Sequence, residues 1–321
     1  MRTVSPLARG WLFAVFYTLF VILFGAVVRI TGSGAGCGQH WPTCHGEVAH
    51  LPQSTETFIE LCHRLTSGLS MVLVFGLTYF TLRSLPARHG ARSSALWASA
   101  FMITEALLGA GLVLLELVGK NDSVSRALVM ALHLLNTAAL LLTMVGAAFL
   151  TRFPERLRLG LFLTEGSARR ATEGHHESRF WQLHVYWVGA LLMLLVAAAG
   201  AVTALGDTVY PVGQRSSLEV AEQLTKPGAH FLEHLRGVHP IVASLAAGFW
   251  VMAGARLVRP WGQTVVILTL LQVAVGVLNI YLSAPGWMQV IHLALFNLLW
   301  LAWALAWLER YPSVLSSKES I

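Results

Sequence analysis

Long apolar segments separated by short polar segments recur along the whole chain. Eight of them are about 20 residues long, the length that an α-helix needs to cross about 30 Å of hydrocarbon. They are predicted at residues 10–28, 58–82, 94–117, 127–150, 181–205, 233–255, 263–283 and 289–308. The first shows no small-residue cleavage site, so we interpret it as a helix of the mature protein and not as a signal peptide.

The composition supports this interpretation. The 321 residues are 55% hydrophobic and only 12% charged, with a mean hydropathy of +0.64. Soluble domains of this size do not have such a balance. The sequence therefore predicts an all-α integral membrane protein with eight transmembrane helices in contact with lipid.

The basic residues are distributed unequally between the two ends of the predicted helices. The positive-inside rule then places both termini in the cytoplasm. The high pI of about 9.6 reflects this topology. The arginines are spread over several short loops, so we expect no nucleic-acid partner. The residues on the cytoplasmic side are Arg2, Arg9, Arg83, Arg88, Arg92, Arg152, Arg156, Arg158, Arg169, Arg170, Arg179, Arg256, Arg259, Arg310 and Lys318.

The two halves of the chain resemble each other. GAVVRITGSG, which begins at Gly25, corresponds to GAVTALGDT, which begins at Gly200. Glu105 is intramembrane, and its partner in the repeat is Gln272, so we expect Glu105 to form a hydrogen bond between helices. The other matched positions are His63 with His239 and His133 with His292.

An even number of helices in each half means that both halves insert the same way up, as parallel repeats. This weakens a transporter interpretation based on inverted repeats. We expect two tandem pseudo-symmetric four-helix bundles, at residues 1–150 and 181–321. The polar residues 151–180 are interpreted as a cytoplasmic linker.

The four matched histidines lie a few residues inside the outer ends of the even-numbered helices. At 1.5 Å per residue, this places them within roughly 10 Å of the outer membrane boundary. Intramembrane ionisable residues are costly and usually functional. Two histidines facing each other across a bundle are a natural axial pair for a haem iron. Equivalent positions and equal depth favour iron ligation over core filling for His63, His133, His239 and His292.

Other histidines fit this pattern less well. His234 lies five residues before His239, about 140° around the helix, so both cannot face one iron. The repeat selects His239 and leaves His230 and His234 as interfacial residues. The outer-loop histidines are interpreted as polar loop residues: His40, His45 and His50.

Glu60 is the sharpest difference between the halves. It lies three residues before His63 and shares its helix face, which suits proton transfer or stabilisation of a developing positive charge. The equivalent position in the second half is Arg236. We therefore expect chemistry in the amino-terminal half and a bound cofactor in the carboxy-terminal half. As alternatives, Glu60 only pairs with Arg64 or caps the helix, and Arg64 and Arg236 bind haem propionates.

Cys37 and Cys44 lie in the first outer loop, in a compartment that permits disulfides. We expect a disulfide that closes this short loop. A free thiol pair, or a metal site with His40 or His45, is the alternative. Cys62 lies inside the second predicted helix and is interpreted as a small buried hydrophobic residue.

Taken together, the E-x-x-H-R of Glu60 to Arg64, the two-cysteine loop after VRITGSG, the GAVTALGDT echo and the four histidines resemble the haem A synthase family. The resemblance covers roughly residues 10–308. It implies a haem b cofactor held by His239 and His292. It also implies that the substrate, haem O, binds near His63 and His133, with Arg64 beside it.

The resemblance further implies an activity. The family oxidises the C8 methyl group of haem O to a formyl group, giving haem A for cytochrome oxidase. Glu60 matches the essential glutamate of the family, and Cys37 and Cys44 match its outer-loop cysteine pair. Haem O synthase and an unidentified electron acceptor or donor are then expected partners. The second half shows no matching cysteine pair.

Two other classes of function remain compatible with the sequence. A di-haem b electron-transfer protein would have two comparable bis-histidine sites and would not need Glu60. A transporter or haem carrier would bind porphyrin without turnover. Conversion of haem O to haem A by the purified protein separates the first interpretation from both.

Overall fold

A computed structural model describes residues 5–153, 173–211, 213, 222, 226–257 and 259–310. Eight helices within these residues are long and apolar enough to cross a membrane, which confirms the predicted fold class. The long helices are α1 (Pro6–Ile30), α2 (Thr55–Ser84), α3 (Gly90–Leu114), α4 (Val124–Arg152), α5 (Glu173–Val209), α8 (Val238–Arg256), α9 (Trp261–Tyr281) and α10 (Gly286–Arg310). Shorter helical segments are η1 (Ser33–Ala35), α7 (Phe231–His234) and η4 (Leu235–Gly237).

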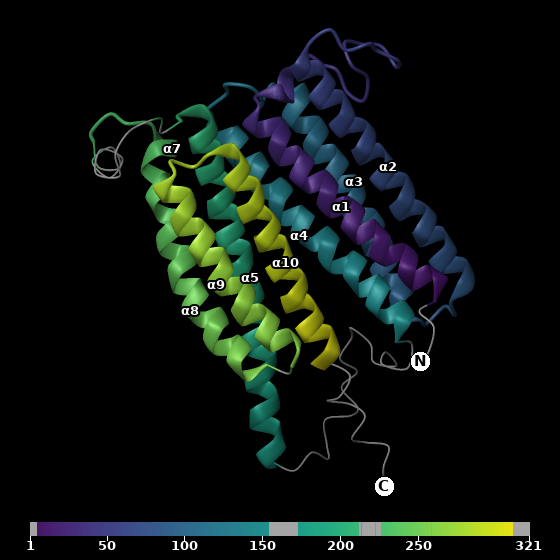
Figure 1. Ribbon diagram of the computed structural model, residues 1–321. Helices are drawn as coiled ribbons and strands as arrows, with labels where there is room; N and C mark the ends of the chain where they lie inside the picture. Colours follow the sequence, from purple (N-terminus) through teal and green to yellow (C-terminus); the bar gives the residue numbers. More distant parts are fainter. Residues whose placement is uncertain are drawn as a thin grey trace.

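The long helices form two groups of four that stand side by side (Figure 1). Helices α1 to α4 make one group, and α5, α8, α9 and α10 make the other. The two groups meet where α4 packs against α5 and α10, and where α1 packs against α10. Residues 154–172 of the predicted linker lie outside the described residues, so the domain boundaries at 150 and 181 stay predictions.

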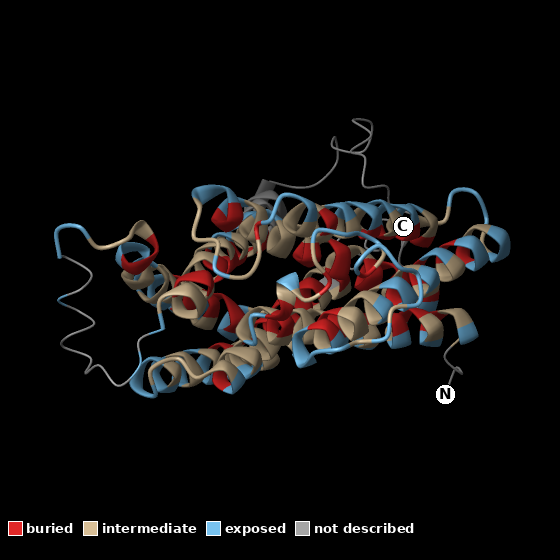
Figure 2. Cartoon of the chain, turned by 90° about the horizontal axis from the view of Figure 1, so that it is seen from above, coloured by how far each residue is buried: buried red, intermediate tan, exposed pale blue. Residues whose placement is uncertain are grey.

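One hydrophobic core runs through both groups. It includes Trp11 and Met144 from the first and Met193 and Trp300 from the second. The indole Nε1 of Trp300 donates a hydrogen bond to the carbonyl of Ala138, 2.8 Å away on α4, and so ties the groups together. Buried positions lie between the helices and exposed positions on the outside (Figure 2). Many of the exposed side chains are apolar and suit contact with lipid.

Most helices begin a few residues before the predicted apolar segments. Ser54 accepts a hydrogen bond from the amide of Thr57, and Ser123 accepts one from the amide of Arg126. These N-caps satisfy amides that the first helical turn leaves unpaired. Hydropathy marks only the apolar part of such a helix, so it missed the polar first turn.

The sixth predicted helix differs from expectation. We predicted one helix over residues 233–255, whereas the structure divides this segment into α7, η4 and α8. Pro240 has no amide hydrogen and is tolerated only within the first turn of an α-helix. A new helix beginning at Val238 places Pro240 in that turn. His239 therefore stands at the start of α8, directly after a tight 3₁₀ turn.

Candidate functional site

The amino-terminal site joins His63 of α2 and His133 of α4. Helices α2 and α4 each pack against both α1 and α3, so the two histidines lie on diagonally opposed helices of this group. The ring of His63 meets the ring of Phe24 edge-on, with 5.7 Å between centroids. Nδ1 of His133 lies 3.3 Å from Oε1 of Glu105 on α3. Helices α1, α2, α3 and α4 thus all contribute to the surroundings of this pair.

Glu105 joins α3 to α4, as predicted. Its Oε2 accepts a hydrogen bond of 2.6 Å from the Asn136 amide, and its Oε1 accepts one from the Thr137 hydroxyl. These two donors hold the carboxylate beside His133. A carboxylate in this position fixes the orientation of an imidazole and makes it a better metal ligand.

Glu60 lies beneath the outer loop and is only 3% exposed. Its Oε2 accepts a hydrogen bond of 2.7 Å from the backbone N–H of Cys37, and its Oε1 accepts one of 3.1 Å from Nε of Arg64. The guanidinium of Arg64 also donates to the carbonyls of His40 and Thr43, each at 2.6 Å. The pairing of Glu60 with Arg64 is therefore real, and it links both side chains to the loop. A role of Arg64 in substrate binding stays a prediction.

The outer loop is closed by a disulfide between Cys37 and Cys44, as predicted. Both cysteines are buried, whereas Cys62 is a free thiol of intermediate exposure. The hydrogen bond from Cys37 to Glu60 therefore starts within the disulfide loop. The loop acts as a cover over Glu60 and fixes one donor to its carboxylate.

The carboxy-terminal site joins His239 of α8 and His292 of α10. Their ring centroids are 6.3 Å apart and their planes are almost perpendicular, at 86°. Two imidazoles that ligate one metal from opposite sides have ring centres about 6 Å apart, because each metal–nitrogen bond is about 2 Å long. Nδ1 of His239 lies 3.2 Å from the carbonyl oxygen of Val196. Because a carbonyl can only accept a hydrogen bond, Nδ1 carries the hydrogen and Nε2 has a free lone pair. The ring spacing and the free Nε2 of His239 fit axial ligation of a haem iron, whereas Nε2 of His292 accepts the Gln272 amide, a hydrogen bond that a bound iron would replace.

The partners of the second pair differ in charge from those of the first. Nε2 of Gln272 lies 3.1 Å from Nε2 of His292, so an amide stands where Glu105 stands in the first half. Arg236, at the position equivalent to Glu60, forms an ion pair of 2.9 Å with Asp207 on α5. It also donates to the carbonyls of Gly206 and Tyr210.

Glycines stand opposite three of the four histidines. A Cβ added at Gly25 would lie 3.2 Å from Cε1 of His63, and one at Gly200 would lie 3.0 Å from Cε1 of His239. A Cβ at Gly276 would lie 3.1 Å from Cε1 of His292. Sequence reasoning did not assign these glycines a role. The repeat could have indicated two of them, because Gly25 and Gly200 are the first residues of the matched GAV motifs.

Arg29 connects the two halves and was also missed. Its guanidinium donates to the carbonyl of Ala204 at 2.6 Å, to the hydroxyl of Thr208 and to Oε1 of Gln289 at 2.9 Å. A second link lies nearby, where the hydroxyl of Tyr210 donates to Asp122 and lowers the pKa of that carboxyl. Such links join residues 88 to 260 positions apart and leave no local sequence pattern.

His230 does not join the iron-ligand candidates. It caps α7, where its ring accepts the amide of Leu232 and its own amide donates to Glu233. The choice of His239 as an iron ligand stays a prediction. In addition, an apolar groove of about 560 Å³ opens along α3 and α4, lined by Phe101, Thr104, Leu107, Leu132, Asn136 and Ala139, among others.

Fold and site together define a class: a multi-pass, eight-helix membrane protein with a histidine pair in each of two four-helix halves. The chain belongs to the COX15-CtaA family of cytochrome oxidase assembly proteins, which it matches over residues 9–304.

Several curated proteins are similar to this chain. A "Heme A synthase" of Bacillus licheniformis is 29% identical over 277 residues, which are 82% of each chain. One of an Exiguobacterium species is 31% identical over 61% of this chain and 57% of its own length. A "Protoheme IX farnesyltransferase" of Thermus thermophilus is 41% identical over 89% of this chain. The match spans only 45% of that longer protein.

Proposed function

We propose that this protein is a haem A synthase, which oxidises the C8 methyl group of haem O to a formyl group. The observation that carries the proposal is the contrast between two similar histidine pairs. Two carboxylates accompany the amino-terminal pair, Glu60 under the outer loop and Glu105 beside His133. An arginine and an amide occupy the corresponding places in the carboxy-terminal half.

In this proposal His63 and His133 hold haem O in the amino-terminal half. Oxidation of a methyl group to a formyl group with water as the oxygen source releases protons and electrons in equal number. Glu60 takes up a proton at its carboxylate, and the fixed negative charge stabilises positive charge that develops at the methyl carbon. The outer loop covers Glu60, which is only 3% exposed.

The carboxy-terminal pair holds haem b as the resident cofactor. The spacing and the nearly perpendicular planes of the His239 and His292 rings support this, as does the lone pair that Val196 leaves on His239. When bound, haem b supplies a one-electron redox centre. The identity of the electron acceptor beyond it is outside this proposal.

The groove along α3 and α4 is suited to the isoprenoid chain that distinguishes haem O from haem b. It is largely apolar, and its member Asn136 also donates to Glu105 beside His133. Thr104 and Asn136 bring one polar pair into it, at 2.6 Å. An Ala139→Phe substitution, which fills the groove, should raise the KM for haem O severalfold. An unchanged KM would show that the groove does not bind the isoprenoid chain of haem O.

The relatives support a pathway context. The Thermus proteins are named for transfer of a farnesyl group to protohaem, and they contain a region like this chain within a longer sequence. We therefore propose that haem O synthase supplies the substrate directly in the membrane. We also propose the orientation expected from the arginine distribution, with both sites near the outer surface of the bacterial inner membrane.

The decisive experiment is turnover by the purified protein. Protein in detergent is supplied with haem O and an electron acceptor, and the haems are then extracted and separated by chromatography. Formation of haem A, or of a hydroxylated haem O, supports the proposal. Binding of haem O and haem b without any oxidation product would instead favour a di-haem electron-transfer protein or a haem carrier.

A further inference from the structure

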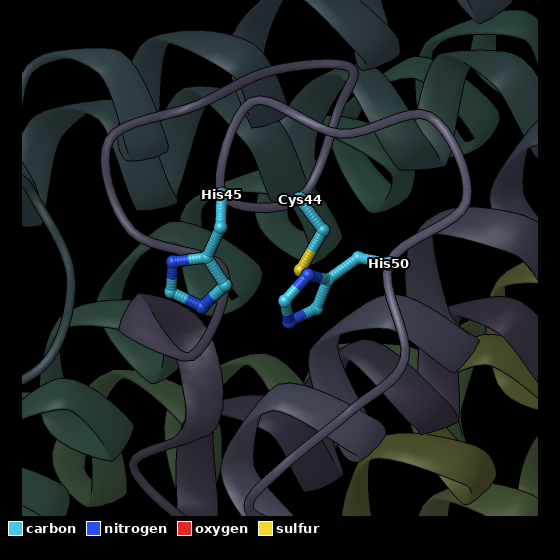
Figure 3. Close-up of side chains that lie close together, drawn as sticks. All are labelled: Cys44, His45 and His50. Carbon is cyan, nitrogen blue, oxygen red and sulfur yellow. The ribbon is translucent and has the colours of Figure 1, made fainter.

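The outer loop carries a cluster of metal-ligating side chains that the proposed reaction does not use. Cys44, His45 and His50 each offer one ligand atom, and these atoms lie within 4.8 Å of one another. Figure 3 shows the Cys44 sulfur next to the His50 ring, with the His45 ring to their left. The ring centroids of His45 and His50 are 4.8 Å apart. His45 is exposed, so an ion has access from the outer side.

A tight turn builds this arrangement. The backbone groups of Cys44 and Glu47 bond to each other in both directions, at 3.1 and 2.9 Å. The two residues between them, His45 and Gly46, have φ of 51° and 82°. Positive φ at both central positions is the mark of a type I′ turn, and it is uncommon for a residue other than glycine. The turn holds the His45 side chain close to the sulfur of its neighbour.

The hydrogen bonds fix which nitrogen of each ring is free. Nε2 of His45 lies 2.9 Å from the carbonyl of Gly36, so Nε2 carries the hydrogen and Nδ1 keeps a lone pair. In Figure 3 this Nδ1 lies on the side of the ring away from Cys44, so the His45 ring has to turn over to present its lone pair to a cation. Nδ1 of His50 lies 3.0 Å from Oε2 of Glu47, which leaves the lone pair on Nε2. Donation of one ring N–H to a carbonyl or carboxylate is the usual support for a metal-ligating histidine.

While the disulfide is intact, the sulfurs of Cys37 and Cys44 cannot act as thiolate ligands. Reduction by a dithiol breaks the Cys37–Cys44 bond, forms a disulfide in the reductant and leaves two thiols. Two thiolates and two imidazoles are a preferred tetrahedral set for Zn²⁺. We propose that this loop is a redox-gated site for Zn²⁺ or a similar thiophilic cation, formed by Cys37, Cys44, His45 and His50. Each thiol releases its proton when it binds the cation.

This site is directly connected to the amino-terminal half. The Cys37 amide donates to Glu60, and Arg64 donates to the loop carbonyls of His40 and Thr43. Breaking the disulfide and binding a cation therefore acts on the donors that position Glu60. The carboxy-terminal histidine pair has no such connection among the described residues.

The first test measures protection of the thiols by Zn²⁺. Full-length protein in detergent is reduced with a phosphine, treated with iodoacetamide with or without Zn²⁺, and analysed by peptide mass spectrometry. Zn²⁺ should slow alkylation of Cys37 and Cys44 at least about 10-fold, and a chelator should restore it. Cys62, a free thiol on α2, is the internal control and should not change. Equal alkylation with and without Zn²⁺ would overturn the proposal.

The second test locates the imidazole ligands. His45→Ala and His50→Ala should each weaken the protection at least about 10-fold, and Glu47→Gln should weaken it less. Val48→Ala is the matched control, because Val48 lies in the same loop and is 93% exposed. The visible spectrum of bound haem checks that each variant is folded. Protection in both histidine variants equal to that in Val48→Ala would rule out the imidazoles and with them the proposed site.

Discussion

The two halves of the molecule place histidines at matching positions but give them different polar and charged neighbours. In the first half, carboxylates stand beside the pair, with Glu105 next to His133 and Glu60 one turn from His63. In the second half, Gln272 contacts His292, and Arg236 occupies the position that corresponds to Glu60.

This difference indicates how a duplicated bundle can divide its work. Each half has a histidine pair with at least one glycine opposite it, and we propose that these pairs hold porphyrins. Carboxylates suit proton transfer, and among the described residues Glu60 and Glu105 accompany the first pair. The outer loop adds a disulfide and a buried hydrogen bond to Glu60, whereas the corresponding arginine is paired with Asp207 of α5.

The largest effect is expected from removing the histidines one half at a time. His239→Ala or His292→Ala should abolish the low-spin spectrum of haem b in the purified protein, because each removes an axial ligand that we propose. His63→Ala or His133→Ala should leave that spectrum intact and abolish haem A formation. Optical and electron paramagnetic resonance spectra, together with haem extraction, measure both. A wild-type low-spin signal in both carboxy-terminal variants would contradict the division of the halves.

Exchanging the residues beside the histidines should have an intermediate effect. Glu105→Gln gives the first half the amide of the second, and should lower haem A yield about 10-fold, because the imidazole of His133 loses its carboxylate partner. The reverse change, Gln272→Glu, should lower the reduction potential of haem b and leave the yield within about twofold. Redox titration measures the reduction potential of haem b in each variant, and haem chromatography measures the yield of haem A. Equal loss of activity from the two changes would mean that the halves are not specialised.

The smallest effect is expected at the glycines. Gly200→Ala places a Cβ 3.0 Å from the ring of His239, and should perturb the haem b spectrum without preventing binding. Gly25→Ala should instead lower turnover about twofold through His63 and leave the spectrum unchanged. Gly109→Ala is the matched control, because no atom lies within 4 Å of an added Cβ there. Identical behaviour of all three variants would show that the glycines do not shape the sites.

Much of this architecture could be predicted from the sequence, because it depends on local hydropathy and on the repeated motifs of the two halves. Hydropathy predicted the eight helices, and the repeat selected His239 over His230, which the structure places in a helix cap. The cysteine spacing and compartment predicted the disulfide. The break before α8 was missed, although Pro240 marked it, because hydropathy alone gave one continuous helix.

The remaining features depend on contacts between distant parts of the chain. Arg29 donates to α5 and α10, more than 170 residues away, and nothing near it in the sequence indicates that partner. The loop cluster depends on a turn with positive φ at His45 and on hydrogen bonds that choose one nitrogen of each ring. The sequence suggested a metal site with His40 or His45 as an alternative, but it did not indicate His50.

The central claim is that the first half performs the oxidation through Glu60, and Glu60→Gln tests it most directly. The variant keeps the size of the side chain and can still accept the Cys37 amide, but it removes the charge. Glu233→Gln is the matched control, because Glu233 is also buried and lies near the outer end of the second half. Haems are extracted from cells that express each variant and separated by chromatography. We predict normal haem b in both, and accumulation of haem O or a hydroxylated intermediate only in Glu60→Gln. A normal yield of haem A from Glu60→Gln would contradict the claim and leave Glu60 as a structural partner of Arg64.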